Sequence, residues 1–165
     1  MANKSLTQER LKEVVEYNSN TGVFIWKKSI AKIVKIGNIA GSQRVDGYLS
    51  FQIDKKMYLA HRLAWFYIYG YFPQMLDHIN QIRNDNRIIN LREASKSENG
   101  QNRLKQKNNN SGIKGVHWAK REKKWLSFIS LNGKRKHLGY FFDKNEAINA
   151  RKDAEIKLHP YYIMI

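Results

Sequence analysis

An Asp–His pair at Asp77 and His78 is the part of the sequence best suited to chemistry. It ends a short apolar run, and amide side chains follow at Asn90 and Asn99. If the chain folds back on itself, one pocket would hold a carboxylate, an imidazole and two amides. Oxygen ligands of this kind suit Mg²⁺ or Mn²⁺. The imidazole, with an ordinary pKa of about 6.5, is largely neutral in a cytoplasm and can take a proton from water.

This stretch, LDHINQIRNDNRIINLREASKSENGQN, resembles the ββα-metal motif of HNH endonucleases. It is most similar to phage and intron-encoded homing enzymes in which Asn replaces the last His. The resemblance implies that Asp77 and Asn99 hold Mg²⁺ or Mn²⁺, with Asn102 as the alternative second ligand. It implies that His78 is the general base and that Asn90 fixes the loop that aims it. It also implies a site-specific cut, most simply a nick made by a monomer on DNA.

Each of these residues has another interpretation when it is taken alone. Asp77 suits a strand end or a turn, and Asn90 suits a cap. Asn99 suits an exposed helix position, because Ser95 and Glu98 form a capping box that begins a helix just before it. The combination, and not any single residue, favours a nuclease site.

The charge of the chain indicates a polyanionic partner. Thirty Lys and Arg face 14 Asp and Glu, a net charge of +16, which favours double-stranded DNA. Arg62, Arg87 and Arg92 are candidates for phosphate contacts, although Arg62, like its neighbour His61, also suits packing at a helix start. An anionic membrane surface is less favoured, because no predicted helix combines a basic face with a broad apolar one.

Features that the sequence lacks exclude some metal sites and some cellular locations. It contains no cysteine, so disulfides and Cys-ligated zinc are excluded. No apolar run approaches the length of a membrane span, and the first residues lack the apolar core of a signal peptide. We therefore expect a cytoplasmic protein without a membrane partner, in the host cytoplasm if a phage encodes it.

Periodicity ahead of the Asp–His pair predicts a mixed lead-in. A helix is expected over residues 5–17, capped by Ser5 and Gln8, followed by a strand at 23–26. Alternating residues 47–53 predict a strand that turns back at 54–56, and a helix over 60–69 should end at Gly70. The basic segment 27–36 fits no element.

A second pattern begins after a polar stretch, 104–110, that is typical of a linker. Three strands are expected at 115–118, 125–131 and 136–141, with a hairpin turn at Asn132-Gly133. Asp143 and Glu146 then open a helix over 144–158 with a narrow alanine stripe. Trp118 and Trp125 suit sheet packing as well as DNA contact.

Residues 111–159 resemble an AP2 domain in their G-V-x-W start, NGKR turn and LGYF-plus-helix ending. The resemblance implies a sheet face that lies in the DNA major groove. Its reading face comprises His117, Ser130, Arg135 and His137. Arg121 and Lys123 lie near the first turn, Lys114 adds positive charge, and Lys134 and Lys136 suit phosphates.

The expected fold class is α+β: a small ββα-metal nuclease domain with a helix and strand lead-in (1–103), a linker (104–110), and an AP2-like three-stranded antiparallel sheet packed on one helix (111–165). The alternative function is a non-cleaving AP2-type DNA-binding regulator. An RNA- or ribosome-associated protein is less favoured, because the expected reading face is mainly polar and basic.

Overall fold

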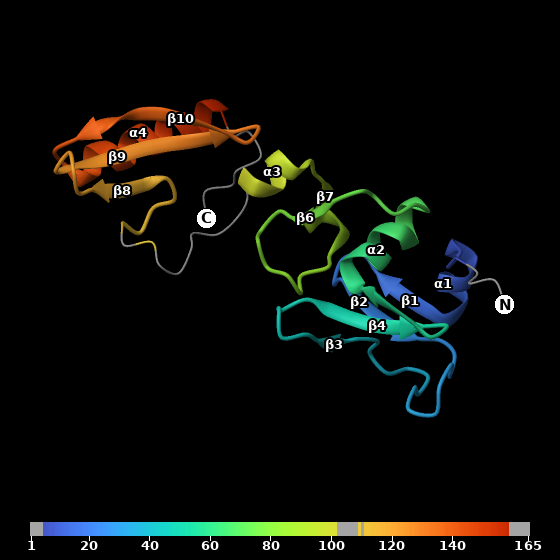
Figure 1. The fold of residues 1–165 in the computed structure, drawn as a ribbon. Helices are drawn as coiled ribbons and strands as arrows, with labels where there is room; N and C mark the ends of the chain where they lie inside the picture. The colour runs from blue at the N-terminus through green and yellow to red at the C-terminus, as the bar shows by residue number, and fades with distance from the viewer. Residues whose placement is uncertain (1–4, 102–108, 110, 159–165) are drawn as a thin grey trace. The chain divides into compact units, whose positions relative to one another are not determined.

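The computed structural model describes residues 5–101, 109 and 111–158, in a mixed α+β arrangement (Figure 1). The chain divides into two compact units, Met1–Glu93 and Ala94–Ile165. The division precedes α3 (Lys96–Gln101), whereas the sequence suggested a boundary after residue 103. In the second unit Asn132 N–H donates to Ser97 Oγ (3.3 Å) and Lys114 Nζ to the Gly100 carbonyl (2.6 Å). Except for residue 109, the expected linker lies outside the described residues.

The first unit begins with α1 (Gln8–Val14), which passes directly into β1 (Val15–Asn18), and β2 (Val23–Trp26) pairs antiparallel with β1. The helix is shorter than expected, because β-branched and aromatic residues after Val14 favour a strand. Its cap is Thr7, whose side chain accepts from Arg10 N–H. Gln8 instead donates to the Phe66 and Tyr67 carbonyls of α2 (Ala60–Tyr69).

The strands β3 (Ser42–Gln43), β4 (Leu49–Ile53) and β5 (Lys56–Leu59) form an antiparallel sheet that leads into α2. Asp54 and Lys55 both have positive φ, 48° and 66°, as a tight hairpin turn requires. Gly70 ends α2 in the left-handed conformation, as expected. After it, β6 (Leu76–His78) pairs antiparallel with β7 (Leu91–Glu93), and a 3-10 turn, η1 (Ile88–Asn90), immediately precedes β7.

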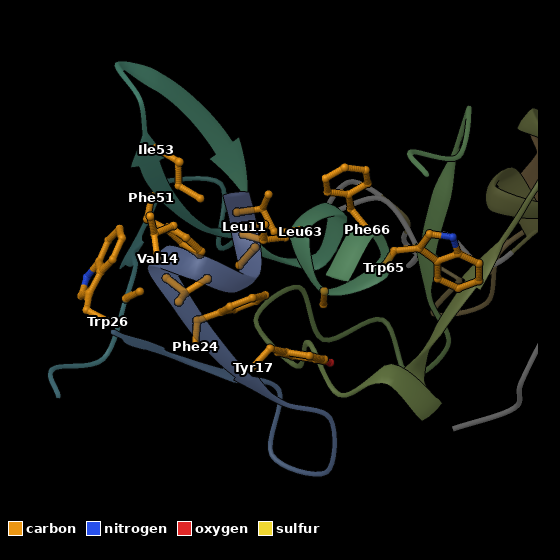
Figure 2. Packing of buried hydrophobic residues seen from close by; sticks show 14 of the residues in the cluster. Leu11, Val14, Tyr17, Phe24, Trp26, Phe51, Ile53, Leu63, Trp65 and Phe66 are labelled. Atoms are coloured by element: carbon orange, nitrogen blue, oxygen red, sulfur yellow. The ribbon is translucent and has the colours of Figure 1, made fainter. Parts of the chain in front are cut away.

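The core of the first unit lies between α1, α2 and the strands β1, β2 and β4 (Figure 2). Leu11, Val14 and Leu63 are fully buried there. Phe24 contacts both Tyr17, with ring centroids 4.6 Å apart, and Phe51, at 5.2 Å. This apolar centre holds the β1–β2 hairpin and α2 in fixed positions behind β6 and β7.

The second unit contains α3, then β8 (Val116–Ala119), β9 (Lys124–Leu131) and β10 (Lys134–Phe141), and α4 (Lys144–Leu158). The strands pair in the order β10-β9-β8, and α4 lies along one face of their sheet (Figure 1). Asn132 and Gly133 have positive φ, 48° and 77°, which confirms the expected hairpin turn. Asp143 Oδ1 accepts from the Glu146 N–H (3.1 Å), so the helix start is confirmed as well.

No described helix is both long enough and apolar enough to cross a lipid bilayer.

Candidate functional site

The β6–β7 hairpin sets the position of the Asp–His pair. Asp77 lies opposite Arg92 and His78 opposite Leu91 in the register of the two strands. Directly opposed residues share one face of an antiparallel pair. Asp77 Oδ2 accepts from Arg92 Nη2 at 3.1 Å, and the Asp77 residue is only 8% exposed. The guanidinium of Arg92 therefore balances a buried carboxylate. The sequence alone predicts instead that Arg92 contacts a flanking phosphate.

Asn90 closes the loop between the two strands, residues 79–90, which we call the site loop. Its Oδ1 accepts from Asn80 N–H at 2.9 Å, and its Nδ2 donates to the Asp85 carbonyl at 2.8 Å. Its own carbonyl accepts from Ile79 N–H at 2.8 Å. The buried amide thus bonds to both halves of the loop. These contacts suit the expected role of fixing the loop.

Replacing Asn90 with Ala should open the site loop. The Asn80 N–H and the Asp85 carbonyl would each lose a partly buried partner. We expect the free energy of unfolding to fall by about 2–3 kcal/mol, measured by chemical denaturation. Asn84→Ala, at an exposed position of the same loop, is the matched control and should change stability by less than about 0.5 kcal/mol. Equal stability of the two variants would contradict this role for Asn90.

The ring of His78 is held by Asn86, a residue that the sequence interpretation did not assign. His78 Nε2 and Asn86 Oδ1 are 3.2 Å apart, and both residues are buried. An amide oxygen only accepts hydrogen bonds, so Nε2 carries the proton and Nδ1 the lone pair. Asn86 thus aims the imidazole directly, whereas Asn90, expected in that role, acts through the backbone of the site loop. Nothing in an Asn-rich loop sequence marks which amide faces inward.

Burial is the main influence on the protonation of His78. It lowers the pKa of the imidazole below its ordinary value, while the Asn86 contact and the Asp77 carboxylate act in the opposite direction. The net lowering keeps His78 neutral at neutral pH. A neutral ring with a lone pair is the form that a general base needs.

The β1–β2 hairpin supports the site loop from behind. The Tyr17 hydroxyl donates to the Asn86 carbonyl at 2.7 Å, and Ile88 N–H donates to the Ser19 carbonyl at 3.1 Å. Gly22 has φ +74°, and a Cβ there would lie 2.5 Å from the Arg87 nitrogen. Only glycine lets the two backbones approach so closely. Sequence patterns gave no sign of this contact, because it joins segments far apart along the chain.

His61 of α2 packs against the catalytic candidate. The His61 and His78 ring centroids are 4.9 Å apart in an edge-on arrangement, and Tyr48 contacts both rings. Burial lowers the pKa of His61 to about 3, with the nearby His78 as a smaller cause. His61 is therefore a neutral packing residue, in agreement with its interpretation from the sequence.

The other two arginines that the sequence suggests for phosphate contacts, Arg62 and Arg87, are also engaged within the first unit. Arg62 Nη2 donates to the Pro73 carbonyl at 2.7 Å, and its guanidinium lies over the Phe72 ring. These contacts fit a packing role for Arg62 better than a phosphate contact. Arg87 forms a two-point ion pair with Asp85 (2.6 and 2.8 Å) while its side chain stays about half exposed. It keeps an outer surface that a phosphate can reach.

Asn99 lies on α3 and is described with the second unit. The expected capping box is confirmed, since Ser95 N–H donates to Glu98 Oε2 (2.5 Å) and Glu98 N–H donates to Ser95 Oγ (3.2 Å). The Asn99 N–H donates to the Ser95 carbonyl at 3.0 Å, so the residue is within the helix. Asn102, the alternative ligand, lies outside the described residues.

The candidate metal ligands in this chain are oxygen donors. No group of three or more His, Cys, Asp or Glu with metal-binding geometry occurs among the described residues. The candidate ligands are one buried carboxylate, on Asp77, and one amide, on Asn99. This donor set fits Mg²⁺ or Mn²⁺, which keep several waters and accept substrate phosphate oxygens as ligands.

The predicted reading residues share one face of the β8–β10 sheet. Buried Ile129 of β9 points to the α4 side, and its neighbour Ser130 points away from it. We call the face of the sheet away from α4 the open face. The other three predicted reading residues also lie on it, since Arg135 pairs with Ser130, His137 with Phe128, and His117 with Leu126. The four side chains thus come to one surface from three strands.

This open face is less polar than the sequence suggested. Phe128 and Tyr140 lie on it as well, and the Arg135 guanidinium stacks over the Phe128 ring at 4.3 Å. Lys134 and Lys136 alternate with Arg135, so they point toward the other face of the sheet. The remaining basic candidates are elsewhere: Lys114 is bonded to α3, and two exposed side chains lie in the β8–β9 turn, Arg121 and Lys123. Trp118 and Trp125 contact each other edge to face, with ring centroids 5.4 Å apart.

Comparison with known proteins identifies the segment that carries the Asp–His pair. Residues 58–101 match the family model described as HNH endonuclease. The chain is also 35% identical over 66 residues to Protein 3.8 of Escherichia phage T7, over 40% of this chain and 52% of that protein. It therefore spans about half the length of the curated relative that it matches. No solved structure matches the chain. The AP2 resemblance of the second unit stays a prediction, whereas the Asp–His pair lies within the segment that matches the HNH endonuclease family model.

Proposed function

We propose that this chain is a site-specific DNA endonuclease of the homing type, which hydrolyses phosphodiester bonds with one divalent ion, Mg²⁺ or Mn²⁺, and nicks one strand as a monomer. The observation that carries the proposal is the buried Asp77–His78 pair inside the HNH match, with the imidazole neutral and held by Asn86. The net charge of +16 supports DNA as the substrate.

The roles of the residues follow from their contacts. His78 Nδ1 accepts the proton of the attacking water, because Nε2 is engaged with Asn86 Oδ1. As the proton arrives, the nearby Asp77 and Asp85 carboxylates stabilise the imidazolium. Arg92 holds Asp77 in place across the hairpin, and Arg87 is available for a flanking phosphate.

Asp77 and Asn99 are the residues that would hold the ion. When bound, it would neutralise charge on the phosphate and stabilise the leaving 3′ oxygen. An amide is a weak ligand, so we expect loose binding of the ion in the absence of DNA. The variants below test whether Asn99 contributes to binding of the ion.

The metal requirement gives the first test. Supercoiled plasmid incubated with the wild-type protein and Mg²⁺ or Mn²⁺ should become nicked circles, and a chelator should abolish the reaction. Asn99→Ala should raise the Mg²⁺ concentration needed for half-maximal cleavage by about tenfold or more, since one ligand is lost. Asn102→Ala is the matched comparison and should leave it unchanged. The reverse pattern would make Asn102 the ligand, and chelator-resistant cleavage would contradict a metal-dependent enzyme.

We further propose that the second unit positions the enzyme through the open face of its sheet, as an AP2-like domain. The shared face of His117, Ser130, Arg135 and His137 supports this proposal. The alternative is a regulator that uses the same face and never cuts. Stable binding to DNA without nicks, under the ionic conditions above, would favour that regulator.

Arg135 is the residue in this face best suited to a guanine. Arg135→Ala should weaken binding to a selected site by about 1–3 kcal/mol, or roughly 5–150-fold, and relax the sequence preference at one position. The sites would be selected from a random duplex pool separately for each variant. Lys134→Ala is the matched control, because this neighbour of Arg135 in β10 points to the other face of the sheet, and it should leave the sequence preference unchanged. An unchanged consensus for Arg135→Ala would remove Arg135 from the reading face.

A further inference from the structure

The basic segment between β2 and β3 forms a fixed loop that presents apolar side chains to solvent. We call residues 29–39 the isoleucine loop. Ile33, Ile36 and Ile39 in it are 90%, 66% and 68% exposed. Single exposed apolar residues are ordinary on a protein surface, but three in one short loop call for a partner. The loop protrudes from the body of the first unit in Figure 1.

The backbone of the isoleucine loop is anchored at several points. Trp26 N–H donates to the Asn38 carbonyl at 2.9 Å, and Gly37 N–H donates to the Trp26 carbonyl at 2.8 Å. Ser29 Oγ donates to the Val34 carbonyl at 2.7 Å, and Val34 packs against the core. Because the loop is tied down, the isoleucines are held outward at little further entropic cost on binding.

The surroundings of the exposed isoleucines are cationic. Lys32 and Lys35 alternate with them along the loop, and both are exposed. A hollow of about 650 Å³ lies between the loop and the β4–β5 hairpin, where Lys35 and Lys55 are among its lining residues. Asp54 also lines it, but it forms a two-point ion pair with Arg10 (3.0 and 2.8 Å). The surface therefore combines apolar side chains with lysines, and its acid is neutralised.

We infer that the isoleucine loop is a second DNA contact, in which Ile33 and Ile36 wedge between base steps from the minor groove while Lys32 and Lys35 hold the flanking phosphates. Apolar wedges of this kind unstack a step and bend the duplex, and lysines beside them bind the backbone on either side. Charge complementarity favours a polyanion such as DNA over a basic or neutral protein partner. The inference rests on the proposed DNA substrate, although it needs no cleavage.

The two parts of the surface predict different defects in the full-length protein. An Ile33→Ser/Ile36→Ser double variant should bind duplex DNA about tenfold more weakly, with the same salt dependence. It should also lose the fluorescence rise of a duplex with 2-aminopurine at flexible TA steps, which reports unstacking. A Lys32→Gln/Lys35→Gln double variant should instead reduce the slope of log K against log salt by about 1.8.

Ile156→Ser is the matched control, because this isoleucine of α4 is 66% exposed but lies in the other unit. It should bind and unstack DNA as the wild type does. Unchanged affinity and fluorescence in the Ile33→Ser/Ile36→Ser variant would overturn the inference. The inference would also be overturned if this variant kept its DNA binding but lost self-association or binding to anionic vesicles. Failure to nick plasmid with Mg²⁺ would count against the proposed nuclease. The binding results would still decide whether the isoleucine loop contacts DNA.

Discussion

A His78→Ala variant is expected to cut DNA roughly 10²–10⁴-fold more slowly than the wild type while binding it with nearly the same affinity. The reason is that the variant lacks the buried imidazole that Asn86 orients. Initial rates of plasmid nicking under saturating Mg²⁺, beside a binding isotherm in Ca²⁺, measure the two quantities separately.

Two further variants test whether a slower His78→Ala enzyme has lost its general base or its folded structure. His78→Gln keeps an amide donor for Asn86 but has no basic nitrogen, so it should be as slow as His78→Ala. Ile89→Ala changes an 81% exposed residue of the same loop and should cut at the wild-type rate. If either His78 variant keeps at least half of the wild-type rate, the general base lies elsewhere.

The second large effect is expected at Gly22, far from the catalytic pair in sequence. Gly22→Ala should lower the free energy of unfolding by about 3–5 kcal/mol. A methyl group there would meet the backbone of Asn86 and Arg87 within 2.6 Å, and the positive φ adds strain. Because the displaced segment carries Asn86, cleavage should fall as well, even at temperatures where the variant stays folded.

Gly37→Ala separates the two causes of this loss. Gly37 also has a positive φ, +85°, but a Cβ there would meet nothing within 4 Å. It should therefore cost only about 1–2 kcal/mol, from the backbone conformation alone. Chemical denaturation of both variants gives the comparison, and equal losses would mean that the β1–β2 hairpin does not support the site loop.

Local patterns were enough to predict the parts of the fold that depend on short-range chemistry. The Ser95–Glu98 box, the Asn132-Gly133 turn and the Gly70 helix end are each determined within a few residues, and each is confirmed. The sequence predicts a first helix that is too long, because Val14 and Val15 satisfy a helical stripe and a strand equally well. Tertiary pairing with β2 decides in favour of the strand.

The candidate site was only partly predictable for the same reason. Asp77 and His78 stand out through their types and spacing, and residues 58–101 match the expected family. Asn86 and Gly22 did not stand out, since their roles arise where distant segments meet. The sequence suggests a phosphate contact for Arg92, because composition does not show the strand register that places this residue across from Asp77.

The short pairing of β6 with β7 limits how this domain can change in length. Successive strand residues point to opposite sides, so a slip of one position would exchange the orientations of Asp77 and His78. Insertions and deletions that shift the ladder would thus destroy the site without touching either residue. Within this hairpin, length variation is best tolerated at the outer tip of the site loop, around exposed Ile82 to Asn84, where it leaves the strand register intact.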